Sequence, residues 1–405
     1  MSELTALPVL RLKRNEDKRL RAGHLWVFSN EVDTAATPLT ALQPGSPARI
    51  VNHRDEFVGY GCVNPQALIC ARLLSRDPAR PIDAALLSQR LQAALALRER
   101  LYHDRCYRLV FGESDGLPGL VVDRFGDVLV GQIATLGMEQ LRPQLEAALH
   151  QVLQPRVLVW KNDSSARDLE SLPHEVLVSG GELPEAVQVV EAGLQLQAPL
   201  AQGQKTGWFY DQTANRERLR RYLPAGARVL DVCSYVGAWA LTALRHGAAR
   251  ATCIDASQQA LDWAQRNAQA NGLALDCLKG DAFQALEQLR AAGERFDVVI
   301  VDPPAFIKRR RDLPQGEAAY RKLNQLALRL LGEGGVLVSC SCSWHLPFDS
   351  LPALVQAAAT QAGREVRILE FGGQSPDHPV HPAIPETRYL KAVFAVVTGQ
   401  AAVTG

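Results

Sequence analysis

The 405-residue chain has no long hydrophobic run and almost no net charge. No apolar stretch reaches about 18 residues without a charged side chain, so no membrane-spanning helix is predicted. Its 44 Lys and Arg nearly balance 43 Asp and Glu, and charge alone therefore identifies no partner. Repeats and low-complexity tracts are absent. The N-terminal stretch has no secretory h-region or cleavage site, which predicts a cytoplasmic protein with reduced thiols.

Metal-binding and dinucleotide-binding motifs are also missing. Eight cysteines over this length are ordinary usage, and stable disulfides are not expected in a reducing compartment. Cys340 and Cys342 lack the second Cys or His pair that a zinc site needs, so no metal is predicted. In "VLDVCSYVGAWAL" Gly237 is the only glycine, whereas a dinucleotide fingerprint needs three, spaced G-x-G-x-x-G.

The order of patterns along the chain predicts three domains. Residues 1–75 contain short apolar runs broken by Pro, Gly and Asn, which is typical of a small β module. The Pro-punctuated "RDPARPID" precedes a helical pattern and then strand-like runs, which predicts an α+β middle domain at 76–185. Residues 186–398 alternate between strand and helix patterns, which predicts an α/β domain.

This last region has the pattern of a doubly wound, Rossmann-like α/β fold. The stretches "ARVLDV", "ATCID", "FDVVIVD" and "GGVLVSC" are buried-strand runs with helical patterns between them. Ser257 is the predicted N-cap of one helix and Gly272 its predicted end. The alternation predicts a mostly parallel sheet covered on both faces, with ligands at the carboxyl ends of its strands.

Acidic residues follow three successive predicted strands: Asp231, Asp255 and Asp281. After the first strand, a loop with Ser234 and Gly237 enters a helix and directs backbone N–H groups at a ligand. Three carboxylates at strand ends suit a nucleoside with a cationic, amino-acid-like tail, and S-adenosylmethionine (SAM) is such a molecule. The alternative interpretation is that each Asp caps the helix behind it.

The fourth strand ends in "DPPAF", whose two prolines fix a loop that directs Asp302 and Phe306 toward a base. At this point the sequence resembles the ribosomal RNA large subunit methyltransferase I family, SAM-dependent enzymes with a PUA domain, a middle domain and a class I methyltransferase domain. The resemblance covers nearly the whole chain, in "HLWVFSNEV", "GESDGLPGLVVDRFGDVLV", "GQKTGWFYDQTANR", "LDVCSYVGAWA", "DPPAF", "SCSW" and "DHPVHPAIPETRYLKAV". It implies rRNA processing, with 5-methylcytosine formed in large-subunit ribosomal RNA, and a homodimer.

A cytosine-5 methyltransferase needs a thiol beside the base. Cytosine C5 attacks a sulfonium methyl poorly, but a thiolate added to C6 makes the ring an enamine, and later loss of the C5 proton expels the thiolate. By the resemblance, Cys342 is the nucleophile, and Asp302 both contacts the cytosine edge and belongs to the cofactor-binding residues. Cys340 is predicted to be a packed core residue. Ala305 stands where many such enzymes place a second cysteine, so another, unidentified group removes the C5 proton.

The resemblance also implies further contacts. The segment "GWFYDQTANR" is similar to one that closes over the cofactor, with Phe209 or Tyr210 stacking on the ligand and Gln212 and Arg216 binding its carboxylate. The basic run after "DPPAF" is predicted to neutralise RNA phosphates, unless it is merely a solvated turn. The predicted substrate-binding residues are Pro303, Pro304, Phe306, Lys308, Arg309, Arg310 and Tyr320.

Other charged segments have less specific interpretations. Basic residues near Trp26 and Phe28 suit phosphate contact with base stacking, although a solvated basic face beside a core Trp fits equally. Turn and hairpin roles are predicted for Glu113, Asp115 and Asp123, because acidic residues that flank Gly and Pro are typical of turns; the alternative interpretation is a carboxylate cluster.

Two alternatives to the cytosine reaction follow from the same residues. The first is a SAM-dependent RNA methyltransferase that acts on a guanine nitrogen, where "DPPAF" orients the base and no thiol is required. The second is a non-catalytic RNA-binding ribosome assembly factor, against which the strand-end acids Asp231, Asp255 and Asp302 argue. The exact target nucleotide, and whether the substrate is naked RNA or a ribosomal particle, do not follow from the sequence.

Overall fold

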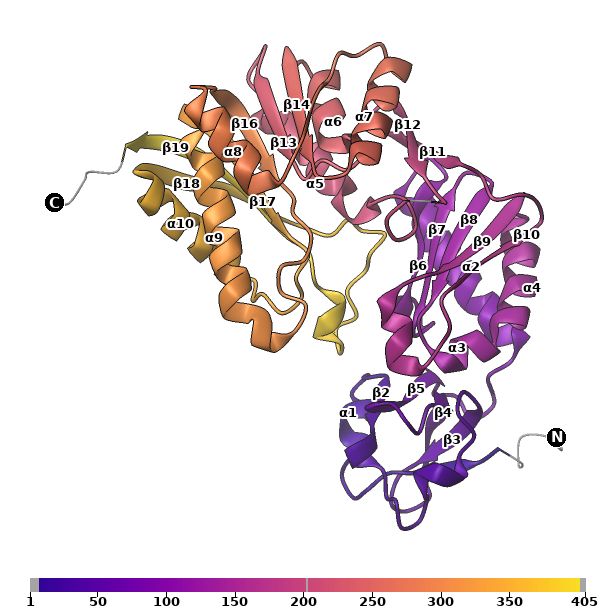
Figure 1. Ribbon diagram of the computed structural model, residues 1–405. Helices are drawn as coiled ribbons and strands as arrows, with labels where there is room; N and C mark the ends of the chain where they lie inside the picture. The colour runs from indigo at the N-terminus through magenta and orange to yellow at the C-terminus, as the bar shows by residue number, and fades with distance from the viewer. Residues whose placement is uncertain (1–6, 202, 401–405) are drawn as a thin grey trace. The chain divides into compact units, whose positions relative to one another are not determined.

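The computed structural model describes residues 7–201 and 203–400 (Figure 1). Residues 1–6 of the predicted N-terminal domain lie outside the described residues. The chain divides into two compact units. The first consists of Met1–Val187, Leu200–Trp208 and Asp377–Thr387, and the second of Gln188–Pro199, Phe209–Pro376 and Arg388–Gly405. Of the described helices, none has the length and apolarity needed to cross a membrane.

The first unit begins with a small β module, as the short apolar runs predict. Its five-stranded sheet has the order β1-β3-β4-β5-β2, with β1 parallel to β3. Its core is built mainly from Leu, Val and Ile side chains and includes Ile384, from the segment that returns to this unit near the C-terminus. The elements are β1 (Val9–Arg11), α1 (Asp17–Arg21), β2 (Trp26–Phe28), β3 (Pro47–Val51), β4 (Phe57–Val63) and β5 (Ile69–Ser75).

A second five-stranded sheet, of order β10-β9-β8-β7-β6, completes this unit. Helices α2 and α4 pack their apolar sides on one of its faces, against Val110, Val122 and Trp160 among others. The elements are α2 (Ala84–Leu101), β6 (Cys106–Phe111), the 3-10 turn η3 (Gly112–Asp115), β7 (Leu120–Phe125), β8 (Val128–Ile133), α3 (Leu136–Gln140), α4 (Arg142–Leu153), β9 (Val157–Asn162), the 3-10 turn η4 (Ser165–Glu170) and β10 (Glu175–Ser179).

Two of the acidic residues that the sequence analysis assigned to turns and hairpins, Asp115 and Asp123, form buried ion pairs. Asp123 lies in the β7–β8 hairpin, as the hairpin prediction allows, but it is fully buried within β7 and paired with Arg108 at 2.6 Å, which the sequence analysis did not predict. Asp115 does lie in η3, and it also holds the fully buried Arg98, with Nη1 2.5 Å from Oδ1. Arg98 donates a further bond of 2.7 Å to the carbonyl of Asp377, in the returning segment.

Removing one partner of this buried pair should be costly. We expect Asp115→Ala to lower the free energy of unfolding by about 3–5 kcal/mol, because it leaves the charge of Arg98 buried without its carboxylate. The matched control is Asp127→Ala, since Asp127 pairs with Arg156 at the surface, where both side chains are more than half exposed. That substitution should cost less than about 1 kcal/mol. Chemical denaturation measures both, and equal losses would contradict the prediction.

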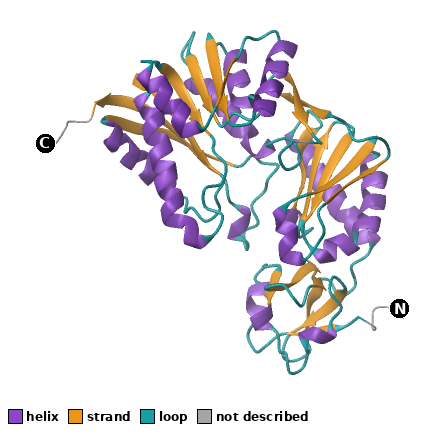
Figure 2. Ribbon diagram, in the orientation of Figure 1, coloured by secondary structure: helices purple, strands orange, loops and turns teal. Residues whose placement is uncertain are grey.

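The second unit is a doubly wound α/β domain, as predicted (Figure 2). Its seven-stranded sheet has the order β15-β14-β13-β16-β17-β19-β18, with five parallel strands and only β19 antiparallel to both neighbours. Helices α5, α6 and α7 contribute to the core on one face, and α8, α9 and α10 to the core on the other. The central strands β13, β16 and β17 contain runs of Val, Ile and Leu, as expected for parallel strands that are covered on both faces.

The hairpin β11 (Ala186–Glu191) and β12 (Leu194–Pro199) comes before the seven-stranded sheet in the chain, and its residues Gln188–Pro199 belong to the second unit. The remaining elements are α5 (Thr213–Leu219), β13 (Arg228–Val232), α6 (Ala238–Arg245), β14 (Arg250–Asp255), α7 (Gln258–Ala270), β15 (Asp276–Lys279), α8 (Ala282–Ala291), β16 (Phe296–Val301), α9 (Leu313–Arg329), β17 (Leu331–Ser341), α10 (Ser350–Ala362), β18 (Arg364–Gly373) and β19 (Lys391–Gln400). The predicted helix boundaries at α7 are confirmed, since Ser257 accepts a bond from the amide of Ala260 and Gly272 follows with a φ of 66°.

Candidate active site

The parallel strands bring most of the predicted site residues to one edge of the sheet. Strands β14, β13, β16 and β17 are consecutive neighbours and run in the same direction. Their carboxyl ends carry, in the same order, Asp255, Asp231, Asp302 and Cys342. Asp281 follows β15 at the end of this row. The edge therefore combines a row of carboxylates with one thiol.

Asp231 is the most deeply enclosed of these acids. Its side chain is fully buried, and Oδ2 accepts a bond of 3.1 Å from the amide of Ala240 at the start of α6. Oδ1 has no hydrogen-bond partner among the described residues. Burial raises the pKa of this carboxyl group to about 8. A ligand that carries positive charge would stabilise the ionised form and supply the missing partner.

The loop after Asp231 has an unusual backbone. Cys233, Tyr235 and Gly237 have φ values of 64°, 50° and 80°, and the first two are uncommon for residues with a side chain. A Cβ at Gly237 would lie 3.0 Å from the Cβ of Ala264, so this position favours glycine for both its φ and its close approach to α7. Ser234 is buried in the same loop, where its amide donates to the carbonyl of Ile254.

Asp255 and Asp281 both contact backbone amides. Asp255 accepts bonds of 2.9 Å from the amides of Tyr235 and Ser257, so it ties the loop to the start of α7. Asp281 caps α8, because its Oδ1 accepts from the amides of Phe283 and Gln284. The capping interpretation is therefore confirmed for Asp281. Its side chain is exposed, and both of these hydrogen bonds use Oδ1 and not Oδ2.

Asp302 is held by two neutral donors. Gln212 donates to Oδ1 at 2.9 Å and the indole of Trp239 donates to Oδ2 at 3.0 Å. Burial raises the pKa of Asp302 to about 6, against the lowering effect of these two bonds. The carboxyl group is thus fixed in orientation at the start of the "DPPAF" loop.

Gln212 and Arg216 belong to the segment that was predicted to close over the cofactor. Gln212 is buried and accepts from Asn215 at 2.7 Å while it holds Asp302. Arg216 is buried in an ion pair with Glu191, so a contact from its guanidinium to a ligand stays a prediction. Phe209 lies edge-on to Tyr235, with ring centroids 5.4 Å apart. The segment thereby packs against the cofactor loop through this ring pair.

The two thiols of "SCS" lie in different environments. Cys340 is completely buried in the core beside α5 and α6, and burial raises its pKa well above the usual value, as a packed thiol requires. Cys342 lies one residue beyond β17 and is partly exposed. All eight cysteines lie in the described part of the chain and none forms a disulfide. The prediction that Cys340 packs is confirmed.

Tyr320 fixes the turn that carries Cys342. The hydroxyl of this buried residue of α9 accepts from Ser341 Oγ at 2.9 Å and lies 2.8 Å from Ser343 Oγ. Ser343 Oγ also accepts from the amide of Ile307, which joins this turn to the "DPPAF" loop. A direct contact between Tyr320 and RNA stays a prediction, whereas its contact with both neighbours of Cys342 is observed.

Lys391 is a residue that the sequence reasoning missed. It pairs with Ser341 in the register between β17 and β19, and its Nζ donates to the carbonyl of Ser343 at 2.6 Å. Burial lowers its pKa to about 8, while the nearby Cys342 acts in the opposite direction. A lysine at the start of the apolar run "KAVFAVV" was the only sequence signal for it. The ammonium group therefore lies beside the turn that presents the thiol.

The loop after Asp302 divides into a packed part and an exposed part. Pro303 is buried and Pro304 is exposed. Phe306 packs between two rings, with centroid distances of 4.8 Å to Tyr320 and 6.3 Å to Phe283. The following basic residues are all exposed: Lys308, Arg309 and Arg310. Over residues 7–201 and 203–400, no group of three or more His, Cys, Asp or Glu side chains could hold a metal ion.

Comparison with known proteins identifies the class. A model of the S-adenosylmethionine-dependent methyltransferases matches residues 145–394, more than half of the chain, and a PUA-like model matches residues 10–76. Two similar solved structures are a SAM-dependent methyltransferase from Streptococcus mutans, with a TM-score of 0.80, and the methyltransferase SMU.776 complexed with SAH, with a TM-score of 0.81. Each is 21% identical and covers 96% of this chain and all of the other, so they support the fold. The protein is a SAM-dependent methyltransferase with an N-terminal PUA-like domain.

Curated relatives define the family more narrowly. Ribosomal RNA large subunit methyltransferase I from Shigella boydii serotype 18 is 37% identical over 388 residues, which is 94% of this chain and 97% of the relative. The protein of the same name from Escherichia coli O139:H28 matches at the same identity and coverage. The chain belongs to the ribosomal RNA large subunit methyltransferase I family.

Proposed function

We propose that this chain methylates C5 of a cytosine in large-subunit ribosomal RNA through a transient bond between Cys342 and C6 of the base. The observation that carries the proposal is the position of Cys342, a partly exposed residue directly after β17, which is the strand adjacent to the one that Asp302 follows. The names of the curated relatives supply the RNA, and the PUA-like domain is a suitable RNA-binding module. Domains at 1–75, 76–185 and 186–398, a homodimer and a cytoplasmic location belong to the same proposal.

The strand edge fits the cofactor. S-adenosylmethionine supplies a methyl group on a positively charged sulfur. The unpartnered Oδ1 of Asp231 is a suitable acceptor for the cationic amino-acid end, because pairing would offset the burial of the carboxylate. The carboxylates of Asp255 and Asp281 are suited to the ribose hydroxyls and the adenine amino group. The proposed binding set is completed by Ser234, Gly237, Asp302, Phe209, Gln212 and Arg216.

The reaction that we propose begins at Cys342. Its thiolate attacks C6 of cytosine, which forms the S–C6 bond and moves the electron pair of the C5–C6 double bond to C5. C5 would then form a bond to the donor's methyl group, whose bond to the positively charged sulfur would break and leave its electron pair on that sulfur as a neutral thioether. A base removes the C5 proton, the double bond re-forms and the S–C6 bond breaks, which returns the thiolate. Asp302, near pKa 6, is oriented to hydrogen-bond the cytosine edge as the ring gains electron density.

The residues around the "DPPAF" loop have proposed roles in holding the RNA. The exposed basic residues Lys308, Arg309 and Arg310 would contact phosphates, which gives an affinity that falls with salt. Pro303, Pro304 and Phe306 shape the loop that the base enters. Tyr320 acts as a positioning residue, since it holds the hydroxyls on both sides of Cys342. The base must leave the RNA stack to reach the thiol.

Lys391 is expected to support the thiolate form of Cys342. Below pH 8 its amine is charged, so Lys391→Met should move the pH at which Cys342 reacts with iodoacetamide upward by about one unit. The difference should shrink above pH 8, where the wild-type amine is neutral. The nearby charged or titratable groups are Cys342, Arg388 and Tyr320, so peptide-level mass spectrometry must follow Cys342 alone.

Two variants serve as controls for Lys391. Lys391→Arg retains the positive charge and should keep the wild-type pH dependence of Cys342 alkylation. If Lys391 had a purely structural role, the difference in charge between the Arg and Met variants would not change this pH dependence. Lys322→Met removes a half-exposed lysine of α9 and should have no effect. Identical alkylation profiles for Lys391→Met and the wild type would contradict this role.

Nucleoside mass spectrometry tests the proposed function directly. Large-subunit ribosomal RNA from cells without this protein should lack one 5-methylcytosine, and expression of the wild-type chain should restore it. A missing methylguanine instead would support the alternative reaction on a guanine nitrogen. Unchanged methylation together with calorimetry that detects no SAM binding would support a non-catalytic assembly role.

A further inference from the structure

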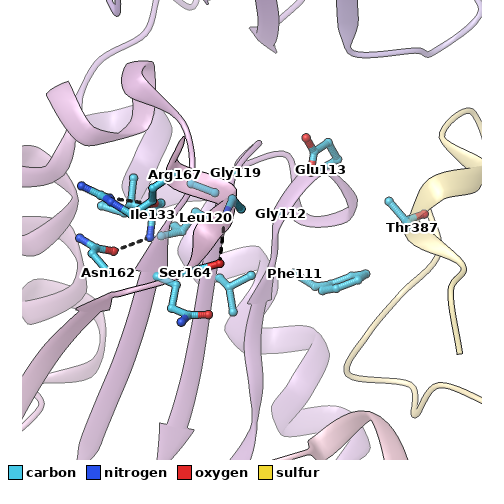
Figure 3. Close-up of a pocket in the computed structure, with 14 residues that line it drawn as sticks. Phe111, Gly112, Glu113, Gly119, Leu120, Ile133, Asn162, Ser164, Arg167 and Thr387 are labelled. Atoms are coloured by element: carbon cyan, nitrogen blue, oxygen red, sulfur yellow. Dashed lines mark hydrogen bonds between the residues drawn. The ribbon is translucent and has the colours of Figure 1, made fainter. Parts of the chain in front are cut away.

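A cavity of about 240 Å³ in the first unit engages its own side chains (Figure 3). Oδ1 of Asn162 accepts from the amide of Ile133 at 2.8 Å, and Nη1 of Arg167 donates to the carbonyl of the same residue at 2.6 Å. The ring of Phe111 lies against that of His378, with centroids 5.1 Å apart. These groups stabilise the protein itself, whereas the second unit carries an exposed aromatic side chain shortly after Cys342.

That side chain is Trp344, which is unusually exposed for a tryptophan of this chain. All six tryptophans are described, and the other five are buried or half-buried, whereas Trp344 is 43% exposed. Trp344 follows Cys342 by two residues, and two residues span at most about 7 Å of backbone. A solvent-exposed indole therefore lies beside the residue to which we assign the attack on the target base.

A tight turn holds Trp344 in place. The carbonyl of Ser343 accepts from the amide of Leu346 at 3.1 Å, which makes Trp344 and His345 the central residues of the turn. Both ends of the turn are fixed, because the hydroxyl of Ser343 accepts from the amide of Ile307 and the side chain of Leu346 is completely buried. The exposure of Trp344 is thus a property of an anchored turn and not of a loose loop.

The indole of Trp344 keeps a ring face for a ligand. Its ring partner is His345, which lies edge-on, with 4.7 Å between the ring centroids and 64° between the ring planes. An edge-on contact covers at most one of the two faces of the indole. Stacking of a nucleic-acid base on an aromatic face contributes about 1–3 kcal/mol, so the uncovered surface of Trp344 is a suitable platform for a base.

A cationic side chain lies beside the same turn. The guanidinium carbon of the exposed Arg388 lies 3.8 Å from the centroid of the Phe348 ring, and Nζ of Lys391 lies 4.9 Å from it. Lys391 also donates to the carbonyl of Ser343, which connects this pair of cations to the turn. In the part of the chain that the structure describes, Arg388 forms no hydrogen bond and no ion pair. Its planar set of donors therefore remains available for an anion such as a phosphate.

We propose that Trp344 stacks on a base next to the target cytosine and that Arg388 binds a neighbouring phosphate. Extrusion of the target from the RNA leaves its neighbours without a stacking partner, and an aromatic ring beside the thiol can replace that partner. The guanidinium, held on the ring of Phe348, pairs with the negative charge of the RNA backbone. The inference rests on the proposed function for RNA as the substrate and for Cys342 as the position of the target base.

Binding of defined RNA probes to the full-length protein tests the stacking contact. The probe is the single-stranded oligonucleotide UUUACAUUU, and in two modified probes an abasic nucleotide replaces the adenosine on one side of the cytosine. The wild type should bind one of these abasic probes about tenfold more weakly, which corresponds to the loss of one stacked base. Trp344→Ala should bind the intact probe about tenfold more weakly, and the same abasic substitution should then weaken binding by less than about twofold. Fluorescence anisotropy measures these affinities.

The salt dependence of binding tests the phosphate contact. Arg388→Met should weaken binding and reduce the slope of log affinity against log salt by about 0.7, as expected when a single strand loses one phosphate contact. The matched control is Arg367→Met, which removes an exposed arginine of β18 and should leave the slope unchanged. The register partner of Arg367 is Val396, five residues beyond Lys391 on β19, so this arginine lies away from the turn.

Trp344→Phe retains an aromatic ring and should bind the intact probe within about threefold of the wild type, and thermal unfolding establishes that each variant is folded. Equal binding of all three probes by the wild type, equal abasic losses in the wild type and Trp344→Ala, or a wild-type salt slope in Arg388→Met would overturn the proposal. The readout is binding and is therefore separate from the reaction. Full methyl transfer by Cys342→Ala, with the dependence on Trp344 intact, would count against the covalent chemistry alone.

Discussion

Cys342→Ala should lower the rate of methyl transfer to large-subunit ribosomal RNA by at least about a thousandfold. Without the thiolate, C5 keeps its low nucleophilicity and no other partly exposed thiol is placed at the end of β17 among the described residues. SAM binding should be unchanged, since the acids that we assign to the cofactor follow other strands. Single-turnover transfer of a labelled methyl group, with calorimetry for SAM, measures the two quantities separately.

Cys340→Ala is the matched control for this substitution. Cys340 lies two residues earlier, within β17, and it is completely buried, so its loss should affect stability and leave the chemistry intact. RNA that contains 5-fluorocytosine gives an independent readout. Fluorine takes the place of the C5 proton that a base must remove, so the double bond cannot re-form and the S–C6 bond persists. The wild type and Cys340→Ala should form a denaturation-resistant adduct, and Cys342→Ala should not. Full turnover by Cys342→Ala would refute the covalent mechanism and favour reaction at a nitrogen.

Asp231→Asn should weaken SAM binding by about a hundredfold. Asp231 is a fully buried carboxylate with one unpartnered oxygen, and removing one member of a buried charge pair costs several kcal/mol. The effect should depend on pH. Because burial raises the pKa to about 8, affinity of the wild type for the cationic ligand should increase as pH rises toward 8 and then level off. Calorimetric titration at several pH values measures this trend, which the Asn variant should lack.

A rise in pH should have the opposite effect on the stability of the ligand-free protein through the same carboxyl group. Between pH about 4 and pH about 8, Asp231 is protonated in the folded state and ionised in the unfolded chain, so the folded state binds more protons. The free energy of unfolding of the ligand-free protein should therefore fall as pH rises, by up to about 1.4 kcal/mol per unit from this group. Asp231→Asn should flatten the slope. Asp281→Asn is the control, since Asp281 is an exposed cap, and an unchanged slope in the Asp231 variant would contradict this account.

The sequence predicted the strand-end acids because alternating strands and helices determine which residues meet at one edge of a parallel sheet. The cap at Ser257 and the helix end at Gly272 were predictable for a similar reason, since both depend on local backbone geometry. Cys340 was predicted to pack in the core, and it is completely buried near the carboxyl end of β17.

The missed features depend on contacts between distant parts of the chain. Lys391 meets the turn after β17 through antiparallel pairing with β19, whose register no local pattern specifies. Asp123 resembled a turn residue because Gly and Pro surround it, but its partner Arg108 lies on the adjacent strand. The hydroxyl of Tyr320 bonds to serines more than twenty residues later. Periodicity could place Tyr320 on a helix face but could not identify these partners.

The returning segment Asp377–Thr387 has a consequence for biosynthesis. Asp377 accepts hydrogen bonds from Arg98, 279 positions earlier, and from the amide of Arg108, 269 positions earlier. A nascent chain therefore cannot complete the interior of its N-terminal half until almost the whole polypeptide has left the ribosome. Translation that stops before this segment should yield a product with an unfinished interior that is prone to degradation.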